Sequence, residues 1–149
     1  MKITEVLVTE HRIFANVFDQ IERALPCLAG LTEVRTLARI VEGLLAQHGG
    51  TETDLAYLAY DHVMEEKGQL QRLHQEHEEI DASLRQVQSA GDCTQARRLL
   101  EGALRTAREH MRFEERHVFP LLECALQPET LTELAATWAR RSAAQPAAL

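Results

Sequence analysis

Residues 107–119 read AREHMRFEERHVF, and within them His110 is followed four residues later by Glu114. His48 and Glu52 repeat this spacing earlier in the chain. At 3.6 residues per turn, side chains four positions apart lie one above the other on one face of a helix. Two helices are therefore expected to present an imidazole and a carboxylate side by side.

Two further histidines, His11 and His77, each occupy one position in an apolar stripe with helical spacing. The stripes consist of Leu7, Phe14, Phe18, Ile21 and Leu25 around His11, and of Leu70, Leu73, Ile80, Leu84 and Val87 around His77. A polar side chain that points into a core needs a partner there. Each of these two helices is therefore expected to send one imidazole inward.

The two halves of the chain use the same order of residues, namely Thr-Glu-His11, His48 and Glu52 in the first half and Gln-Glu-His77, His110 and Glu114 in the second. This repetition predicts a pseudo-twofold site. Four imidazoles and two carboxylates suit two metal ions, with two imidazoles on each ion and the glutamates bridging. Iron, manganese or a mixed pair fits this donor set, whereas a structural zinc, iron–sulfur or all-oxygen calcium site does not.

The chain as a whole predicts an all-α fold, an up-and-down four-helix bundle with a short C-terminal extra helix. Only four prolines and seven glycines occur, and apolar residues recur at steps of three and four. We expect helices at residues 3–25, from a cap at Thr32 through residue 58, from a cap at Asp61 to Ser89, at residues 94–125, and from Pro128 through Trp138. The Gly49-Gly50 pair is expected to distort the second helix.

Composition indicates one soluble domain, since 45% of the 149 residues are hydrophobic and 26% are charged. We assign residues 1–141 to this domain and residues 142–149, which are poor in bulky apolar side chains, to a frayed tail. The formal net charge of -7, without any Lys/Arg block, argues against nucleic acid and against an anionic membrane surface as partners.

The same sequence predicts a cytoplasmic protein. No segment approaches the ~20 apolar residues of a membrane span, and the N-terminal residues lack the apolar run of a secretory signal. Cys27, Cys93 and Cys124 lie far apart and form no CxxC pair, as expected of reduced thiols. We expect a monomer or a small homo-oligomer that binds a small neutral ligand or a protein.

Three segments resemble one known family: Thr-Glu-His-Arg-Ile-Phe, Gln-Glu-His-Glu-Glu-Ile-Asp and His-Met-Arg-Phe-Glu-Glu-Arg-His-Val-Phe-Pro. Over about Thr4 to Glu123 the chain is similar to the hemerythrin-like, or HHE cation-binding, domains. The resemblance implies a four-helix bundle that holds two non-haem irons with an oxo or hydroxo bridge. It further implies reaction with dioxygen, nitric oxide or hydrogen peroxide, or a role in reporting iron and oxygen status. The metal ligands that it implies are His11, His48, Glu52, His77, His110 and Glu114.

Departures from the oxygen carriers of this family indicate which branch the chain resembles. The carriers have a second histidine four residues before the one on the third helix, where this chain has Leu73. They place the last carboxylate at the position of Glu115, whereas members that respond to oxygen stress or iron use the position of Glu114. The chain is therefore similar to the latter branch. His74 is the only nearby histidine that could lean toward the site.

Several residues have an alternative interpretation that the sequence leaves open. His62 and Glu66 repeat the four-residue spacing, but near the expected start of a helix, where both would face solvent. His117 is expected to face solvent or to hydrogen-bond a ligand. Tyr57 and Tyr60 either pack in the core or reach the metals.

The leading functional hypothesis is a di-iron protein that binds or reacts with dioxygen, nitric oxide or hydrogen peroxide. No residue beyond the metal ligands stands out as catalytic, and the sequence leaves turnover open. The absence of the carrier histidine argues against simple carriage. The alternative is a sensor or adaptor whose fold depends on metal. A ferritin-like oxidase needs two Glu-x-x-His pairs, of which the chain has only one, at Glu114 and His117. In a metal-free interaction module, the inward histidines would belong to a polar core or to a partner-binding surface.

Overall fold

The computed structural model describes residues 1–58 and 68–144, and within these residues it contains helices and no strand. The helices are α1 (Ile3–Ala24), α2 (Leu31–Thr51), α4 (Gln69–Ser89), α5 (Cys93–Phe113), α6 (Phe119–Ala125) and α7 (Pro128–Ala144). A 3-10 turn, Leu25–Cys27, follows α1, and π-helical segments follow α2 at Glu52–Tyr57 and α5 at Glu114–Val118. The predicted all-α class is confirmed.

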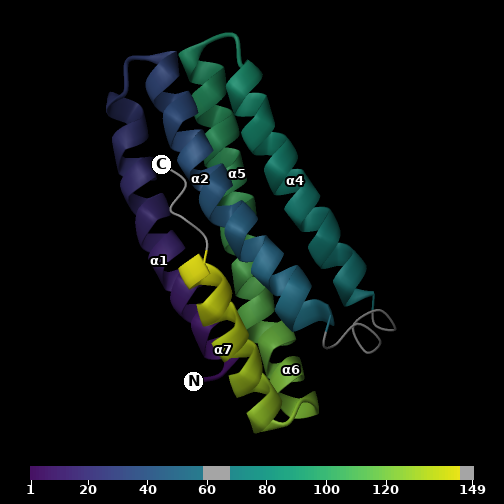
Figure 1. Ribbon diagram of the computed structural model, residues 1–149. Helices are drawn as coiled ribbons and strands as arrows, with labels where there is room; N and C mark the ends of the chain where they lie inside the picture. Colours follow the sequence, from purple (N-terminus) through teal and green to yellow (C-terminus); the bar gives the residue numbers. More distant parts are fainter. Residues whose placement is uncertain (59–67, 145–149) are drawn as a thin grey trace.

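The helices form an up-and-down bundle, as expected. Along the chain α1, α2, α4 and α5 alternate in direction, and α5 continues through its π segment into α6 (Figure 1). The final helix, α7, turns back and packs beside α1 at the end of the bundle where the chain begins (Figure 1). The extra C-terminal helix is therefore present, and it extends to Ala144, three residues past the predicted end of the domain. The rest of the predicted frayed tail, residues 145–149, lies outside the described residues.

The cap predicted at Thr32 is wrong, because α2 begins at Leu31 and its N-cap is Gly30, two residues earlier. The backbone N–H of Gly30 donates to the Glu33 carboxylate at 3.0 Å, so an acidic side chain on the first turn satisfies the amide group there. At the start of α5 the Asp92 carboxylate accepts from the backbone N–H of Gln95 at 2.8 Å. The cap predicted at Asp61 lies outside the described residues.

Apolar residues form two separate clusters along the bundle axis. The upper cluster includes Phe14, Phe18 and Met111, and the lower one, which also holds residues of α6 and α7, includes Leu7 and Leu73. Along α1 and α4, the inward histidines lie between residues that belong to different clusters. A polar layer therefore separates two apolar cores.

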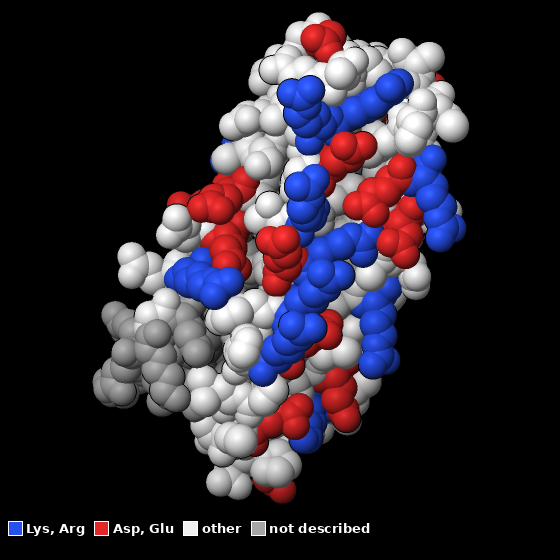
Figure 2. All heavy atoms as spheres, turned by 180° about the vertical axis from the view of Figure 1, so that it is seen from behind, with Lys and Arg blue, Asp and Glu red and all other residues white. Residues whose placement is uncertain are grey.

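The outer surface is charged with both signs. On the face shown in Figure 2, basic side chains run along the bundle with acidic side chains beside them. Arg108 illustrates such pairing, since its guanidinium lies 2.6 Å from Asp19 and 3.1 Å from Glu22. None of the described helices is long and apolar enough to span a membrane.

Candidate metal centre

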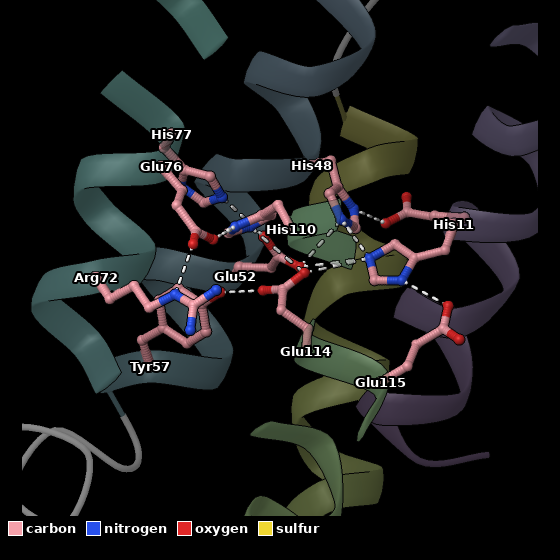
Figure 3. A network of polar contacts seen from close by, with 11 residues as sticks. His11, His48, Glu52, Tyr57, Arg72, Glu76, His77, His110, Glu114 and Glu115 are labelled. Carbon is pink, nitrogen blue, oxygen red and sulfur yellow. Dashed lines mark hydrogen bonds and ion pairs between the residues drawn. The ribbon is translucent and has the colours of Figure 1, made fainter. Parts of the chain in front are cut away.

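The four inward histidines and the two paired glutamates meet in the polar layer (Figure 3). They come from all four long helices of the bundle, and both glutamates are the first residues of the π segments. Their relative exposures are 3% for His11 and His48, 4% for His110 and 0% for Glu52 and Glu114. His77 is less enclosed, with 23% of its side chain exposed.

Glu52 lies at the middle of the cluster, and its two oxygens face different histidines. Oε1 is 3.0 Å from Nε2 of His48 and 3.8 Å from Nε2 of His11. Oε2 is 3.4 Å from Nε2 of His77 on the opposite side. One carboxylate is therefore shared by two groups of imidazoles.

Glu114 occupies the second central position. Its Oε2 is 3.5 Å from Nε2 of His11 and 3.5 Å from Nε2 of His110, so it too lies between the two groups. Its other oxygen, Oε1, accepts a hydrogen bond from the buried Tyr57 hydroxyl. Tyr57 packs in the lower apolar cluster, as one of its two interpretations predicts, and its hydroxyl contacts this central carboxylate.

Both central glutamates begin a π-helical segment, which widens the helix at that point. At the second segment, the backbone N–H of Phe119 bonds to the carbonyl of Glu114, five residues earlier. The distortion predicted near Gly49-Gly50 is present, because α2 continues through both glycines to Thr51 and the π segment begins at Glu52. The second segment has no glycine pair, so the widening follows the buried glutamates in both halves.

Three histidines are held from outside by a carboxylate. Nδ1 of His48 contacts Glu10 at 2.9 Å, Nδ1 of His110 contacts Glu76 at 2.8 Å, and Nδ1 of His11 contacts Glu115 at 2.9 Å. These carboxylates all lie outside the central group. Each carboxylate keeps the proton on Nδ1 and directs Nε2 inward, which is the arrangement that orients histidine ligands in metal sites. Sequence reasoning missed this role, although Glu10 and Glu76 stand in the repeated Glu-His pairs that it noted.

The pKa values of the buried groups show how strongly the cluster favours positive charge. Burial opposes a charge on His48, yet the carboxylates of Glu52 and Glu10 raise its pKa to about 10. Burial likewise opposes ionisation of Glu52, but His48 and the neighbouring imidazoles hold its pKa well below the usual range. Burial and the negative charge of Glu52 raise the pKa of Glu114, so two adjacent buried carboxylates resist being ionised together.

Burial and the charges of both central glutamates also raise the pKa of Tyr57. Its phenol therefore keeps its proton and donates to Glu114. Burial lowers the pKa of His110, which favours the neutral imidazole that metals bind.

The other candidate residues lie away from the centre. His74 is exposed, with its ring centroid 6.1 Å from that of Tyr57, and His117 is exposed and packs on Phe113. Glu115 contacts the outer nitrogen of His11 rather than the interior of the cluster. His62, Glu66 and Tyr60 lie outside the described residues.

Unpartnered buried atoms test whether a metal fits this cluster. Within the described part of the chain, both oxygens of Glu52, Oε2 of Glu114 and Nε2 of His110 are buried without a hydrogen-bond partner. Such atoms are costly unless an ion or a donor satisfies them. Ligand atoms of two groups lie within 4.8 Å of one another, namely His11, His48, Glu52 and Glu114 in the first group and Glu52, His77 and His110 in the second. The residues present therefore fit two cations that share Glu52.

The helical bundle and its buried cluster of histidines and glutamates place this protein in the class of metal-binding helical bundles. Comparison with protein families makes the assignment specific, because the model of the hemerythrin HHE cation binding domain matches residues 2–122. The chain belongs to this family. Comparison with curated proteins and with solved structures gave no match. The family and the cluster together indicate a site for metal ions.

Proposed function

We propose that the protein is a non-haem di-iron protein that binds or reacts with dioxygen, nitric oxide or hydrogen peroxide. The observation that carries this proposal is the position of Glu52, whose two oxygens face separate groups of imidazoles. A carboxylate in that position would hold two ions at once, and the imidazole and carboxylate donors suit iron or manganese. Iron supplies the electrons for reduction of such small molecules when it is bound.

The residues of the chain have distinct tasks in this proposal. The six central side chains hold the ions, and the outer glutamates orient three of the imidazoles. The apolar clusters border the layer on both sides along the bundle axis and keep water away from it in those two directions. Tyr57 holds a proton at its hydroxyl beside Glu114, and no separate general base lies in the cluster.

Metal content tests the proposal directly. We expect inductively coupled plasma mass spectrometry to find close to two irons per chain, with a ferric absorption band that changes on addition of peroxide or oxygen. Glu52→Gln removes the shared carboxylate and should bring the content below one per chain. Glu101→Gln, on an exposed position of α5, is the matched control and should keep both ions. A content far below one in the unaltered protein, even after anaerobic reconstitution with ferrous iron, would overturn the proposal.

A second candidate function is a sensor or adaptor whose fold depends on metal. It is favoured by the unpartnered buried atoms of Glu52, Glu114 and His110, which destabilise the bundle unless a cation binds them. Chelation should then lower the melting temperature measured by circular dichroism, since a ligand that binds only the folded state stabilises it. An unchanged melting curve after chelation would contradict this function and leave the redox function in place.

We place the protein in the cytoplasm within the same proposal. Cys27, Cys93 and Cys124 are free, and Cys27 and Cys124 are exposed, which fits a reducing compartment. Fractionation of the source cells checks this placement, and size-exclusion chromatography with light scattering checks the expected monomer or small homo-oligomer.

A further inference from the structure

The two halves of the centre differ in how they enclose their histidines. Glu115 directly follows Glu114 and contacts the outer nitrogen of His11. The corresponding residue after Glu52 is Thr53, which carries no carboxylate. Within the described residues, His77 is the one inward histidine that no outer carboxylate contacts at Nδ1.

The residues that directly follow His110 and His48 also differ, and again the side near His77 carries the smaller side chain. Met111 follows His110 and is buried in the upper apolar cluster, whereas Gly49 follows His48. A Cβ placed on Gly49 would lie 3.3 Å from Cε1 of His77, so the glycine lets that ring lie against the backbone of α2. The side chain of His77 is 23% exposed, whereas the other three inward histidines are 4% exposed or less.

A cavity of about 550 Å³ opens on this exposed side, between α2, α4 and α5. His48, His77 and His110 contribute to its lining, and so do both glycines of α2. Its walls are mainly apolar and include Leu45, Ile80, Ala107 and Met111. The cavity therefore joins the surface to the group formed by Glu52, His77 and His110, and its volume far exceeds that of a diatomic molecule.

The described acidic residues in the lining of this cavity lie toward its outer side, away from the imidazoles of the centre. They are Asp54, Glu78 and Asp81, and among the described residues of the lining there is no lysine or arginine. Asp54 is paired with Arg141 at 3.0 Å, which leaves Glu78 and Asp81 as the acidic groups of the rim. Carboxylates at a cavity mouth repel anions and leave neutral molecules unaffected.

We propose that small neutral molecules reach the metal centre through this cavity, at the position held by His77 and His110, and that its acidic rim disfavours anions. The inference rests on the proposed di-iron function and adds to it a route and a charge preference. Gly49 and Gly50 are positioning residues in this inference, because they keep the α2 wall of the cavity free of side chains. The position held by His11 and His48 is the closed half of the centre.

Chemical labelling of the metal-free protein tests the route without any activity measurement. Diethyl pyrocarbonate, a small neutral reagent, modifies histidine, and peptide mass spectrometry gives a rate for each residue. We expect His77 to react several-fold faster than His11, with the exposed His117 as the internal reference. Gly50→Leu places a side chain in the lining and should slow His77 several-fold. Gly43→Leu, at an exposed position of the same helix with no atom within 4 Å of its added Cβ, should not.

Equal labelling of His77 and His11, or no effect of Gly50→Leu, would overturn the route. Iron content separates this failure from failure of the proposed function. If the protein holds close to two irons per chain but His77 and His11 are labelled equally, the access route alone is overturned. Iron below one per chain with the expected labelling overturns the proposed function.

Association rates of two probes on the iron-loaded protein test the charge preference. Azide is the anionic probe for the ferric protein, and nitric oxide is the neutral probe for the ferrous protein. The double substitution Glu78→Gln and Asp81→Asn should raise the azide rate about threefold or more at low salt, with a smaller effect near 1 M salt where charges are screened. The nitric oxide rate should stay within about twofold, and Glu101→Gln should change neither rate. An azide rate that is unchanged or lower in the double variant would overturn the acidic filter.

Discussion

Outer carboxylates determine which nitrogen each buried imidazole turns toward the centre. Glu76 lies on α4, yet it holds His110 of α5, so its effect crosses from one helix to the next. Arg72 contacts the same carboxylate at 2.6 Å and fixes its orientation. A residue that never touches a metal is therefore expected to influence how tightly metal is held.

Glu76→Gln should weaken metal binding roughly 10- to 100-fold, because the amide holds the imidazole of His110 less strongly than the carboxylate does. Competition with a chromophoric chelator measures this change. Glu79→Gln, on an exposed position of the same helix, is the control and should leave binding unchanged. Equal affinities of the two variants would contradict the role assigned to Glu76.

Tyr57→Phe should destabilise the metal-free protein by about 1–3 kcal/mol, because Oε1 of the buried Glu114 loses its donor. Urea unfolding of the metal-free and the loaded protein measures the two free energies of unfolding. We expect a smaller loss in the loaded protein, where a cation satisfies the carboxylate. A loss of equal size in both forms would assign Tyr57 to packing alone.

Among the elements, α2 shows how one helix combines a regular stretch with a widened one. Its glycines differ in their surroundings: Gly43 has open space at its Cβ position, whereas Gly49 lies against the ring of His77. The helix then widens at Glu52, which turns this carboxylate into the polar layer. Glycine has a lower helix propensity than alanine, but at Gly49 a larger residue would crowd the ring of His77.

Gly43→Ala should stabilise the protein by roughly 0.5–1 kcal/mol, since alanine has the higher helix propensity and nothing obstructs its methyl group. Gly49→Ala should gain less or lose stability, and it should lower metal content, because the methyl group displaces His77. Thermal unfolding and metal analysis of both variants check this pair. Equal stabilisation with full metal content in both would show that the contact of Gly49 with His77 has no consequence.

The whole molecule depends on α7 to complete the lower apolar cluster. Leu131 of this helix is fully buried there, whereas Leu58, beyond the first π segment, is 67% exposed. Leu131→Ala should therefore cost about 2–5 kcal/mol of unfolding free energy, measured by urea denaturation, and Leu58→Ala close to nothing. Losses of similar size would mean that α7 does not contribute to the core.

For the whole molecule, the sequence predicts the helices and the histidines that point into the bundle. The 3.6-residue period indicates the helices, and a histidine inside an apolar stripe is a strong local signal, as at His11 and His77. The contact of Glu115 with His11 depends on which helices pack together, which periodicity does not encode. The π segments also escaped prediction, because a widened turn changes the register by a single residue. Residue preference alone predicts a cap at Thr32, whereas the Glu33 carboxylate accepts from the backbone N–H of Gly30 and so favours a helix start at that residue.

The polar layer between the two apolar clusters has a consequence for how the molecule opens. The same four helices run through both clusters, and between the clusters the helices face one another across the shared glutamates and histidines, so we expect each cluster to open as a unit of its own. Amide hydrogen exchange should therefore report two opening free energies in the metal-free protein, one for each end of the bundle, and a single common value once cations join the four helices. Bound cations at the centre would thus couple the two ends of the bundle, so that both ends open together.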